Sequence, residues 1–287
     1  MDSITIKDIA KMCGVGVTTV SRAMNNHPDI NKQTKAKVMK VIKENNYVPN
    51  NSARNLKRSQ SKTIAVLIKG ITNPFFNKML QVFEKETKSR KYSYILQKVD
   101  ENQDEIDVAI ELEKEKRLKG IVFLGGYFSH TKEKLEQLTV PFVLSTIVMA
   151  SQAGENNYSS VSVDDFAESY KIVNYLCSLG HKKIAIISAP MNDESIGQLR
   201  FDGYKKALED NHIKLDRNLV WCMKDCIEGY SMKNGYEVTK ELLKSEEEFT
   251  AIYAISDSLA VGACKAILET GKKIPDDYSV AGFDGMD

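Results

Sequence analysis

The segment TIKDIAKMCGVGVTTVSRAMN, residues 5–25, carries the clearest structural signal in this 287-residue chain. Thr5 is a suitable N-cap for a first helix, and Asp8 supplies an acid in the first turn. Gly14 is suited to end this helix, and a second helix is expected from about Val17 to Asn25. Such a short connection between two helices is typical of a helix-turn-helix. The apolar residues of the first helix recur at helical spacing at Ile6, Ile9, Ala10 and Cys13.

A third helix is expected to complete a small core with the first two. Asn31 is a good N-cap for it, and Asn45–Asn46 tolerate the left-handed conformation that ends helices. The side chains expected to turn inward from the second and third helices are Val20, Ala23, Met24, Val38, Val41 and Ile42.

The second helix of a helix-turn-helix lies in the major groove and presents its first residues to base edges. Here those residues are Val17, Thr18 and, one turn on, Arg22. Arg22 can form a forked pair of hydrogen bonds with guanine, whereas Val17 offers only an apolar contact. Hydrogen bonds to phosphates, which position a protein on DNA without specifying sequence, are expected from Thr19, Ser21, Asn25 and Asn26.

Charge is distributed unevenly along the chain. Forty Lys and Arg residues nearly balance 39 Asp and Glu residues, for a net charge of +1. Residues 1–62, however, contain twelve basic and four acidic residues, a charge of +8, and the remainder carries −7. A small basic head on an acidic body is typical of a polyanion binder. A solvated basic face is the alternative, and the helix-turn-helix pattern favours the first interpretation.

Residues 50–58, NNSARNLKR, form a short basic segment with one large apolar residue. Isolated helices this short are marginal in water, so we expect the segment to be disordered alone and to fold against a partner. Arg54, Lys57 and Arg58 indicate DNA as that partner. Leu56 would then be a wedge between base steps in the minor groove. A plain linker is the alternative, and the residues alone do not separate the two.

From residue 63 onward, short apolar runs alternate with amphipathic stretches. Most runs are continuous, as in strands covered on both faces. The alternation predicts βαβ units, parallel sheets and right-handed crossovers, arranged in two similar lobes. The expected strands are residues 63–68, 94–99, 120–124, 141–145, 160–163, 183–188, 219–223, 250–255 and 279–283. The expected helices are residues 75–91, 104–116, 166–179, 198–211, 232–243 and 259–269.

The loops after the expected strands form the candidate ligand site, because ligands of open α/β sheets bind outside the carboxyl ends of strands. Their aromatic rings, fork donor and carboxylates suit a polyhydroxylated ligand. Structural alternatives remain: Phe75 and Phe76 as core residues, Asp257 as an N-cap, Arg200 as the partner of a surface acid. The loop residues are Asn73–Phe76, Tyr127–Phe128, residues 191–200, Gly229–Tyr230, Ser256–Asp257 and Asp284.

A set of short motifs follows a definite order along the chain. The first are TIKDIA (5–10), GV (14–15), TVSR (19–22) and NN (25–26); then come YVPN (47–50), AR (53–54) and Leu56; then TIAVLI (63–68) and NPFF (73–76). In this order they resemble the headpiece, the hinge helix and the start of the effector domain of the lactose-repressor family of bacterial transcription regulators. The resemblance covers essentially the whole chain.

The resemblance implies a fold class and a domain organisation. It implies an N-terminal all-α helix-turn-helix headpiece over residues 1–47, and a hinge helix and linker over residues 48–61. It further implies an α/β two-lobed, periplasmic-binding-protein-like domain with parallel sheets over residues 62–287, which binds effector and dimerises. Because the chain ends at Asp287, just past an expected strand, we expect a truncated record or a shortened product that lacks a final helix and strand.

The resemblance also implies site residues. Leu56 becomes the minor-groove lever, Arg200 begins an Arg-x-x-Gly-aromatic segment whose arginine clamps the effector, and Asp284 matches an effector acceptor. The expected DNA contacts are Thr5, Val17, Thr18, Thr19, Ser21, Arg22, Asn25, Asn50, Ala53, Arg54 and Leu56. The expected effector contacts are Phe75, Phe76, Arg200, Tyr230, Ser256, Asp257 and Asp284.

Departures from the family pattern limit what is carried over. Gly16 stands where a capping Ser or Asn is usual, and Ser256 replaces a common Asn. Leu144–Thr146 stand where many members have an Asp-Arg pair, and Asp164–Asp165 replace a common Asp-Asn. The chemistry of the pocket rim and the identity of the effector are therefore not implied.

The remaining sequence features favour a cytoplasmic protein, associated with the nucleoid when bound to DNA. No run of about 18 apolar residues predicts a membrane span, and Met1–Thr5 begin no signal peptide. The five scattered cysteines suit a reducing compartment. Cys222 and Cys226 lie near no histidine at zinc spacing, so no metal and no cofactor are expected.

We therefore expect a sequence-specific repressor that binds double-stranded operator DNA as a homodimer. A small metabolite, a sugar or sugar derivative, would close or twist the lobes and thereby fold or melt the hinge helices. A transporter's solute-binding protein is one alternative, against which the basic head argues. An enzyme is another, but no G-x-G-x-x-G, Walker loop or Gly-x-Ser-x-Gly elbow is present. We interpret the acid pairs Asp164–Asp165 and Asp276–Asp277 as loop and cap acids, because adjacent side chains diverge.

Overall fold

The chain divides into two units, residues 1–61 and residues 62–287, which we call the head and the body. A computed structural model describes residues 4–25, 27–45, 47, 62–70, 73–100, 103–126, 128–147, 158–190 and 195–286. The expected hinge contacts lie outside the described residues; they are Asn50, Ala53, Arg54 and Leu56.

The head contains three helices around one small core: α1 (Ile6–Cys13), α2 (Val17–Met24) and α3 (Lys32–Glu44). At the start of α1, the Asp8 carboxylate accepts hydrogen bonds from the Thr5 amide at 2.9 Å and from its hydroxyl at 2.6 Å. Gly14 ends α1 with φ +63°, a backbone conformation that favours glycine. The fully buried core residues are Ile9, Ala10, Cys13, Val20, Ala23 and Val38, with Met24, Val41 and Ile42 partly buried around them.

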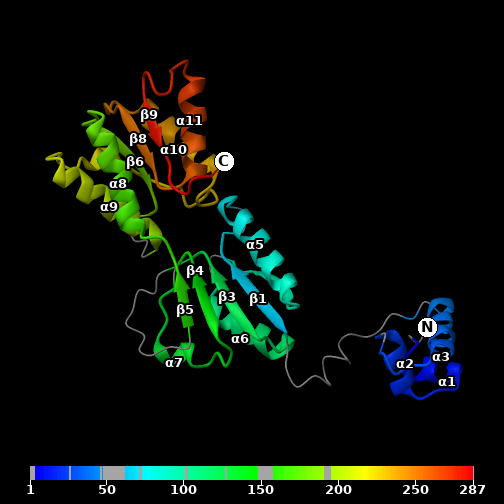
Figure 1. The fold of residues 1–287 in the computed structure, drawn as a ribbon. Coiled ribbons are helices and arrows are strands. Elements are labelled where there is room, and N and C mark those ends of the chain that lie inside the picture. Colours follow the sequence, from blue (N-terminus) through cyan, green and yellow to red (C-terminus); the bar gives the residue numbers. More distant parts are fainter. Residues whose placement is uncertain are drawn as a thin grey trace. The chain divides into compact units, whose positions relative to one another are not determined.

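The first lobe of the body, residues 62–162, is built on a five-stranded parallel sheet in the order β2-β1-β3-β4-β5 (Figure 1). Along β1, Ala65 and Leu67 face one core with α6, whereas Val66 and Ile68 face a second core with α5. This alternation places helices on both faces of the sheet, as right-handed crossovers require. The elements are β1 (Thr63–Ile68), α5 (Phe75–Ser89), β2 (Ser93–Lys98), α6 (Glu105–Lys116), β3 (Gly120–Leu124), α7 (Lys132–Leu135), β4 (Phe142–Ser145) and β5 (Tyr158–Val161).

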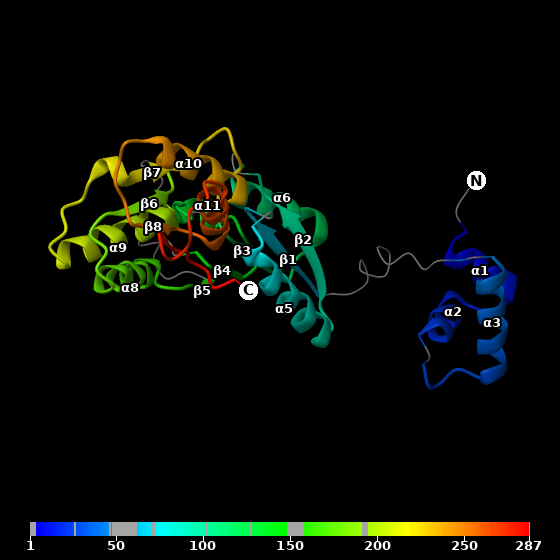
Figure 2. The ribbon, with the colours of Figure 1, turned by 90° about the horizontal axis from the view of Figure 1, so that it is seen from above.

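The second lobe, residues 163–286, has a four-stranded parallel sheet in the order β7-β6-β8-β9. Helices α8 and α9 pack together on one side of it, and α10 and α11 pack together on the other (Figure 2). All residues of β6 and β8 are buried. The elements are α8 (Asp165–Ser178), β6 (Ile184–Ser188), α9 (Ile196–Asp210), η1 (Arg217–Leu219), β7 (Val220–Cys222), α10 (Met232–Lys244), β8 (Ala251–Ala254), α11 (Asp257–Glu269) and β9 (Ser279–Ala281).

The structure differs from the expected elements mainly at the sheet edges. Strand β5 begins at Tyr158 rather than at residue 160, and Val161 and Val163 are exposed rather than covered on both faces. Among the described residues, β5 lies at the edge of the sheet and pairs with β4 alone. The short helix α7 was not expected, since four residues carry too little periodicity. None of the described helices is long and apolar enough to span a bilayer.

Candidate functional site

The head presents an exposed face on α2. Gly16 is its N-cap, and Val17, Thr18 and Arg22 are all exposed, as a base-reading role requires. Thr5 and Asn25 are exposed as well, and the Asn25 side-chain amide donates to the Ser21 carbonyl at 2.7 Å. Thr19 and Ser21 are half-buried. The structure therefore places Val17, Thr18 and Arg22 on the exposed face of α2, whereas Asn26 lies outside the described residues.

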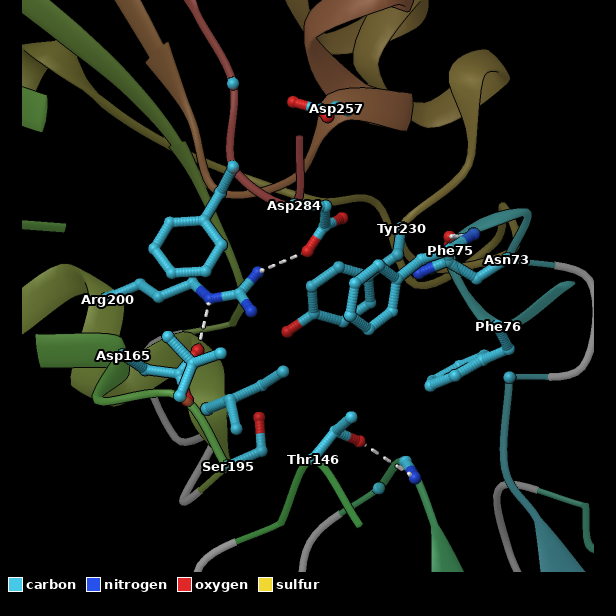
Figure 3. A pocket seen from close by; sticks show the side chains of 18 of the residues that line it. Asn73, Phe75, Phe76, Thr146, Asp165, Ser195, Arg200, Tyr230, Asp257 and Asp284 are labelled. Atoms are coloured by element: carbon cyan, nitrogen blue, oxygen red, sulfur yellow. Dashed lines mark hydrogen bonds and ion pairs between the residues drawn. The ribbon is translucent and has the colours of Figure 1, made fainter. Parts of the chain in front are cut away.

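The body contains a cavity of about 830 Å³ lined by residues from both lobes. Lys69 and Gly125 follow β1 and β3 of the first lobe, and Asp257 and Asp284 follow β8 and β9 of the second. The cavity thus lies at the carboxyl ends of both sheets, where ligands of open α/β sheets bind. Figure 3 shows side chains of residues that line it.

Arg200 is the central cation of this cavity, and it is held from three sides. Its Nε donates to Asp165 Oδ1 at 2.8 Å, and its Nη1 donates to the Ile255 carbonyl and lies 3.6 Å from Asp284 Oδ1 (Figure 3). The guanidinium also lies 3.7 Å from the centre of the Phe283 ring. Its side chain is only 6% exposed. The arginine is therefore preorganised by α8, by the residue after β8 and by the segment after β9 before any ligand binds.

Asp284 faces the cavity in an unusual electrostatic state. Burial raises its pKa to about 7, although the nearby Arg200 guanidinium favours the ionised form. Its Oδ2 is buried and has no hydrogen-bond partner within the described part of the chain. Burial also raises the pKa of Asp165, against the effect of Arg200. The Arg200 guanidinium thus faces two buried carboxyl groups, those of Asp165 and Asp284.

Aromatic rings supply the apolar part of the cavity. Phe75 and Phe76 open α5 with their rings edge to face, at a centroid distance of 5.4 Å. The Asn73 side chain accepts a hydrogen bond from the Phe75 amide at 3.1 Å and so fixes the start of the helix. Tyr230 has a positive φ of +52° and approaches from the second lobe (Figure 3). These rings can stack on the apolar faces of a sugar.

Close packing shapes the first-lobe wall. Gly125 has φ +72°, and a Cβ built there would lie 2.7 Å from both the Lys69 carbonyl and the Phe76 ring. Only glycine fits this position. The Gly125 amide donates to the Thr146 hydroxyl at 3.3 Å, which joins the ends of β3 and β4 (Figure 3).

Lys69 is the second cation of the cavity, and it forms an ion pair with a carboxylate outside the cavity lining. Its Nζ lies 2.7 Å from Oε2 of the buried Glu105, the first residue of α6. Nε2 of His130 lies 2.8 Å from the other Glu105 oxygen. Burial opposes ionisation of Glu105, but the hydrogen bonds with His130 and Lys69 outweigh it and hold the pKa below its ordinary value. Glu105 is therefore an anion at neutral pH.

Six of the seven predicted effector contacts line this cavity: Phe75, Phe76, Arg200, Tyr230, Asp257 and Asp284. Ser256 does not; it is buried and its hydroxyl accepts from the Leu259 amide as the cap of α11. Phe128, from the predicted loop set, is buried in the first-lobe core because its ring packs against Phe123. Tyr127 lies outside the described residues.

Sequence reasoning missed three residues that shape the electrostatics of the cavity. The interpretation of Asp164–Asp165 as cap acids applies to Asp164, which caps α8, but is wrong for Asp165, which pairs with Arg200. Lys69 and Glu105 were not singled out, because neither has a motif and their pairing joins positions far apart in sequence. Within the described ranges, no group of three or more side chains is arranged to hold a metal ion.

A helical head with an exposed second helix, followed by a two-lobed body with a cavity between its sheets, defines the class: a DNA-binding unit joined to a ligand-binding α/β domain. Residues 5–50 match the family of bacterial regulatory proteins called the lacI family. Residues 61–287 match the periplasmic binding proteins and sugar binding domain of the LacI family. The chain belongs to the lacI family of transcription regulators. The relatives that it matches are transcription regulators rather than enzymes.

Similar proteins support this assignment. The chain is 43% identical to the HTH-type transcriptional regulator MalR of Clostridium butyricum, over 99% of this chain and 84% of that protein. It is 32% identical to the HTH-type transcriptional repressor PurR of Haemophilus influenzae strain PittEE, over 98% and 81%. The crystal structure of the lac repressor dimer bound to operator and the anti-inducer ONPF has a TM-score of 0.76 at 23% identity, covering 100% of this chain and 84% of that one, and shares the fold.

Proposed function

We propose that this regulator is a cytoplasmic repressor that binds operator DNA through its head and a sugar through the body cavity. The observation that carries the proposal is the preorganised Arg200, set among carboxylates and aromatic rings in a cavity between two lobes. Aromatic faces combined with fixed polar groups are the usual means of binding a polyhydroxylated molecule.

The DNA-binding half of the proposal rests on α2. Val17 and Thr18 begin this helix, and Arg22 lies one turn later, all exposed. We infer that these three reach base edges in the major groove. Thr5, Thr19, Ser21 and Asn25 would position the head through phosphates. We propose a DNA-binding domain over residues 1–47, a hinge helix and linker over residues 48–61, and an effector-binding and dimerisation domain over residues 62–287. In the hinge, Asn50, Ala53, Arg54 and Leu56 would contact the minor groove.

The effector half assigns roles within the cavity. Arg200 would donate to ligand hydroxyls, and Asp257 and Asp284 would accept from them. Phe75, Phe76 and Tyr230 would stack on the sugar rings. A ligand that contacts both lobes favours their closed arrangement, so its binding free energy can be transmitted to the head. A homodimer would place its two heads on the two halves of a near-palindromic operator. When bound to DNA, the protein would be associated with the nucleoid.

Selection of DNA ligands tests the proposal. The purified chain is incubated with a random duplex library, bound DNA is amplified over several rounds, and the enriched sequences are read. We expect enrichment of a near-palindromic sequence, bound with an affinity that falls steeply as salt rises. Binding that shows no sequence enrichment, or no salt dependence, would overturn the proposal.

A further inference from the structure

The charge of the cavity restricts the kind of sugar that it can hold. Among the described residues that line it, five carry carboxyl groups and two carry cationic groups. The carboxyl groups belong to Asp165, Glu168, Glu228, Asp257 and Asp284, and the cationic groups to Lys69 and Arg200. The lining is therefore net negative, whereas sites for phosphate or carboxylate ligands usually supply an excess of donors and positive charge.

Both cations of the cavity are already neutralised by buried acids. Arg200 faces Asp165 at 2.8 Å and Asp284 at 3.6 Å, and all three side chains are at most 6% exposed. Lys69 faces Glu105 at 2.7 Å, and the Glu105 side chain is 8% exposed. An anionic ligand would have to compete with these preformed pairs, inside a site where charges interact more strongly than in water.

The protein's own polar side chains already occupy a first-turn amide in four of the helices that begin at this edge. Helix N-termini are ready-made phosphate sites when their amides are free. Here the side chains of four polar residues accept hydrogen bonds from first-turn amides of α5, α8, α9 and α11: Asn73, Asp164, Ser195 and Ser256. In α8 and α11 the first helical residue is also an acid, Asp165 or Asp257.

The segments of the body that the structure does not describe add no basic residue to this balance. Residues 71–72, 101–102, 127, 148–157 and 191–194 contain neither Lys nor Arg. The charge balance of the described lining therefore gains no cation from them.

We propose that the effector is a carbohydrate without a phosphate or carboxylate group, and that Glu105 enforces this choice by neutralising Lys69. Glu105 lies behind the cavity wall, so it is a positioning and specificity residue that acts through Lys69. The inference rests on the proposed sugar-binding function and adds the charge class of the ligand to it.

Titration calorimetry of the full chain against matched sugar pairs tests the inference. The probes are glucose with glucose 6-phosphate, trehalose with trehalose 6-phosphate, and sucrose with sucrose 6-phosphate, alongside further neutral mono- and disaccharides and their phosphate esters. We expect at least one neutral sugar to bind, and its phosphate ester to bind at least about tenfold more weakly. A phosphate ester that binds as tightly as its parent sugar overturns the inference while leaving the proposed function intact. A folded protein that binds neither form of any pair overturns both.

Glu105→Gln isolates the role of Lys69. The amide keeps the shape of the side chain but removes its charge, so Lys69 becomes an unneutralised cation at the cavity wall. We expect the affinity for phosphate esters to rise about tenfold, with the affinity for neutral sugars changed less than about threefold. The matched control is Glu111→Gln, an exposed acid on the same helix, which changes the net charge equally.

Unchanged discrimination in Glu105→Gln, with the protein shown to be folded by circular dichroism, would contradict the assigned role of Glu105. If the variant does not fold, the comparison of sugar pairs on the unmodified chain still decides the charge class of the ligand, and Lys69→Met tests the role of Glu105 from the other side of the pair. Because its positive charge is already neutralised, loss of Lys69 should weaken ester binding by no more than about threefold relative to neutral sugar. A larger loss would contradict the proposal.

Discussion

Arg200 organises the cavity because one guanidinium is shared between two buried carboxyl groups. Its bond to Asp165 is direct, at 2.8 Å, whereas Asp284 lies 3.6 Å away and keeps one oxygen without a partner. Asp284 also has a φ of +112°, which few residues other than glycine, Asn and Asp adopt. Such a partly satisfied buried carboxylate lowers stability and can accept a hydrogen bond from a ligand.

Asp284→Asn is expected to change the pH dependence of stability. The pKa of Asp284 is about 7 in the folded chain against an ordinary 3.8. As pH rises from about 4 to 7, the unfolded chain loses this proton before the folded chain does, so the residue lowers stability progressively across this window and by a constant amount above it. The amide cannot ionise, so the variant should be more stable at pH 8, by on the order of 1–4 kcal/mol.

Urea unfolding of both proteins between pH 4 and pH 8 measures this effect. The free energies of unfolding should diverge as pH rises and then run parallel above about pH 7. Asp276→Asn is the control, since Asp276 is an exposed acid of the same lobe. Curves that stay parallel from pH 4 to pH 8 would show that Asp284 is ionised throughout in the folded protein. The groups that face Asp284, namely Arg200, Asp165 and Asp257, remain in both proteins.

Substitutions of Arg22 can distinguish the effect of its positive charge on DNA binding from the effect of its planar hydrogen-bonding geometry. Arg22→Lys keeps the positive charge but loses the planar fork that pairs with guanine. On the selected operator we expect an affinity loss of about 1–3 kcal/mol with little change in the salt slope. Arg22→Ala should lose the charge as well, and its binding to random duplex should also weaken. Equal discrimination between operator and random DNA in Arg22→Lys and the unmodified chain would exclude a base contact by this residue.

At the scale of elements, the close packing of helices α10 and α11 fixes the second-lobe wall of the cavity. A Cβ built on Gly262 of α11 would lie 2.1 Å from the Met232 carbonyl of α10. A Cβ on Gly235 of α10 would lie 2.2 Å from the Leu259 carbonyl of α11. The two glycines thus allow the helices to approach each other to backbone contact, and they set the positions of Tyr230 before α10 and Asp257 at the start of α11.

Gly262→Ala is expected to force α10 and α11 apart. The added methyl group meets backbone, which cannot rotate away, so we expect a loss of about 1–3 kcal/mol in the free energy of unfolding. Val261→Ala on the same helix is the control, because Val261 is 51% exposed and its truncation should change stability by less than about 0.5 kcal/mol. Chemical denaturation of both variants gives the answer. A Gly262→Ala protein as stable as the control would mean that the helices tolerate a wider separation.

The elements were predictable where a pattern is local and strong. The sequence predicts β1 and β6 from their continuous apolar runs, and α1 and α2 from the helical spacing of their apolar residues. In each of these elements the residues that become buried form a pattern within the element itself. The start of β5 was not predictable, because an exposed edge strand has little apolar pattern. The helix α7 was not predictable either, because four residues are too few to show helical spacing. The pairs Lys69–Glu105 and Arg200–Asp165 form only after the chain folds, so no spacing in the sequence reveals them.

The whole molecule combines two chemistries in one chain: a basic head that would bind DNA and an acidic body that would bind a non-anionic sugar. The head, residues 1–61, carries a net charge of +7, and the body, residues 62–287, carries −6. The body's charge discourages its own contact with DNA and leaves binding to the head. Linkage then requires that any effect of sugar on DNA affinity be matched by an equal effect of DNA on sugar affinity.

The most direct test measures the affinity of the full chain for its selected operator duplex by fluorescence anisotropy, with and without a saturating neutral sugar identified by calorimetry. We expect a change in operator affinity of at least about fivefold, and a reciprocal change in sugar affinity of the same size when operator is present. Operator affinity that is identical with and without bound sugar would contradict the claim that the body cavity controls the head.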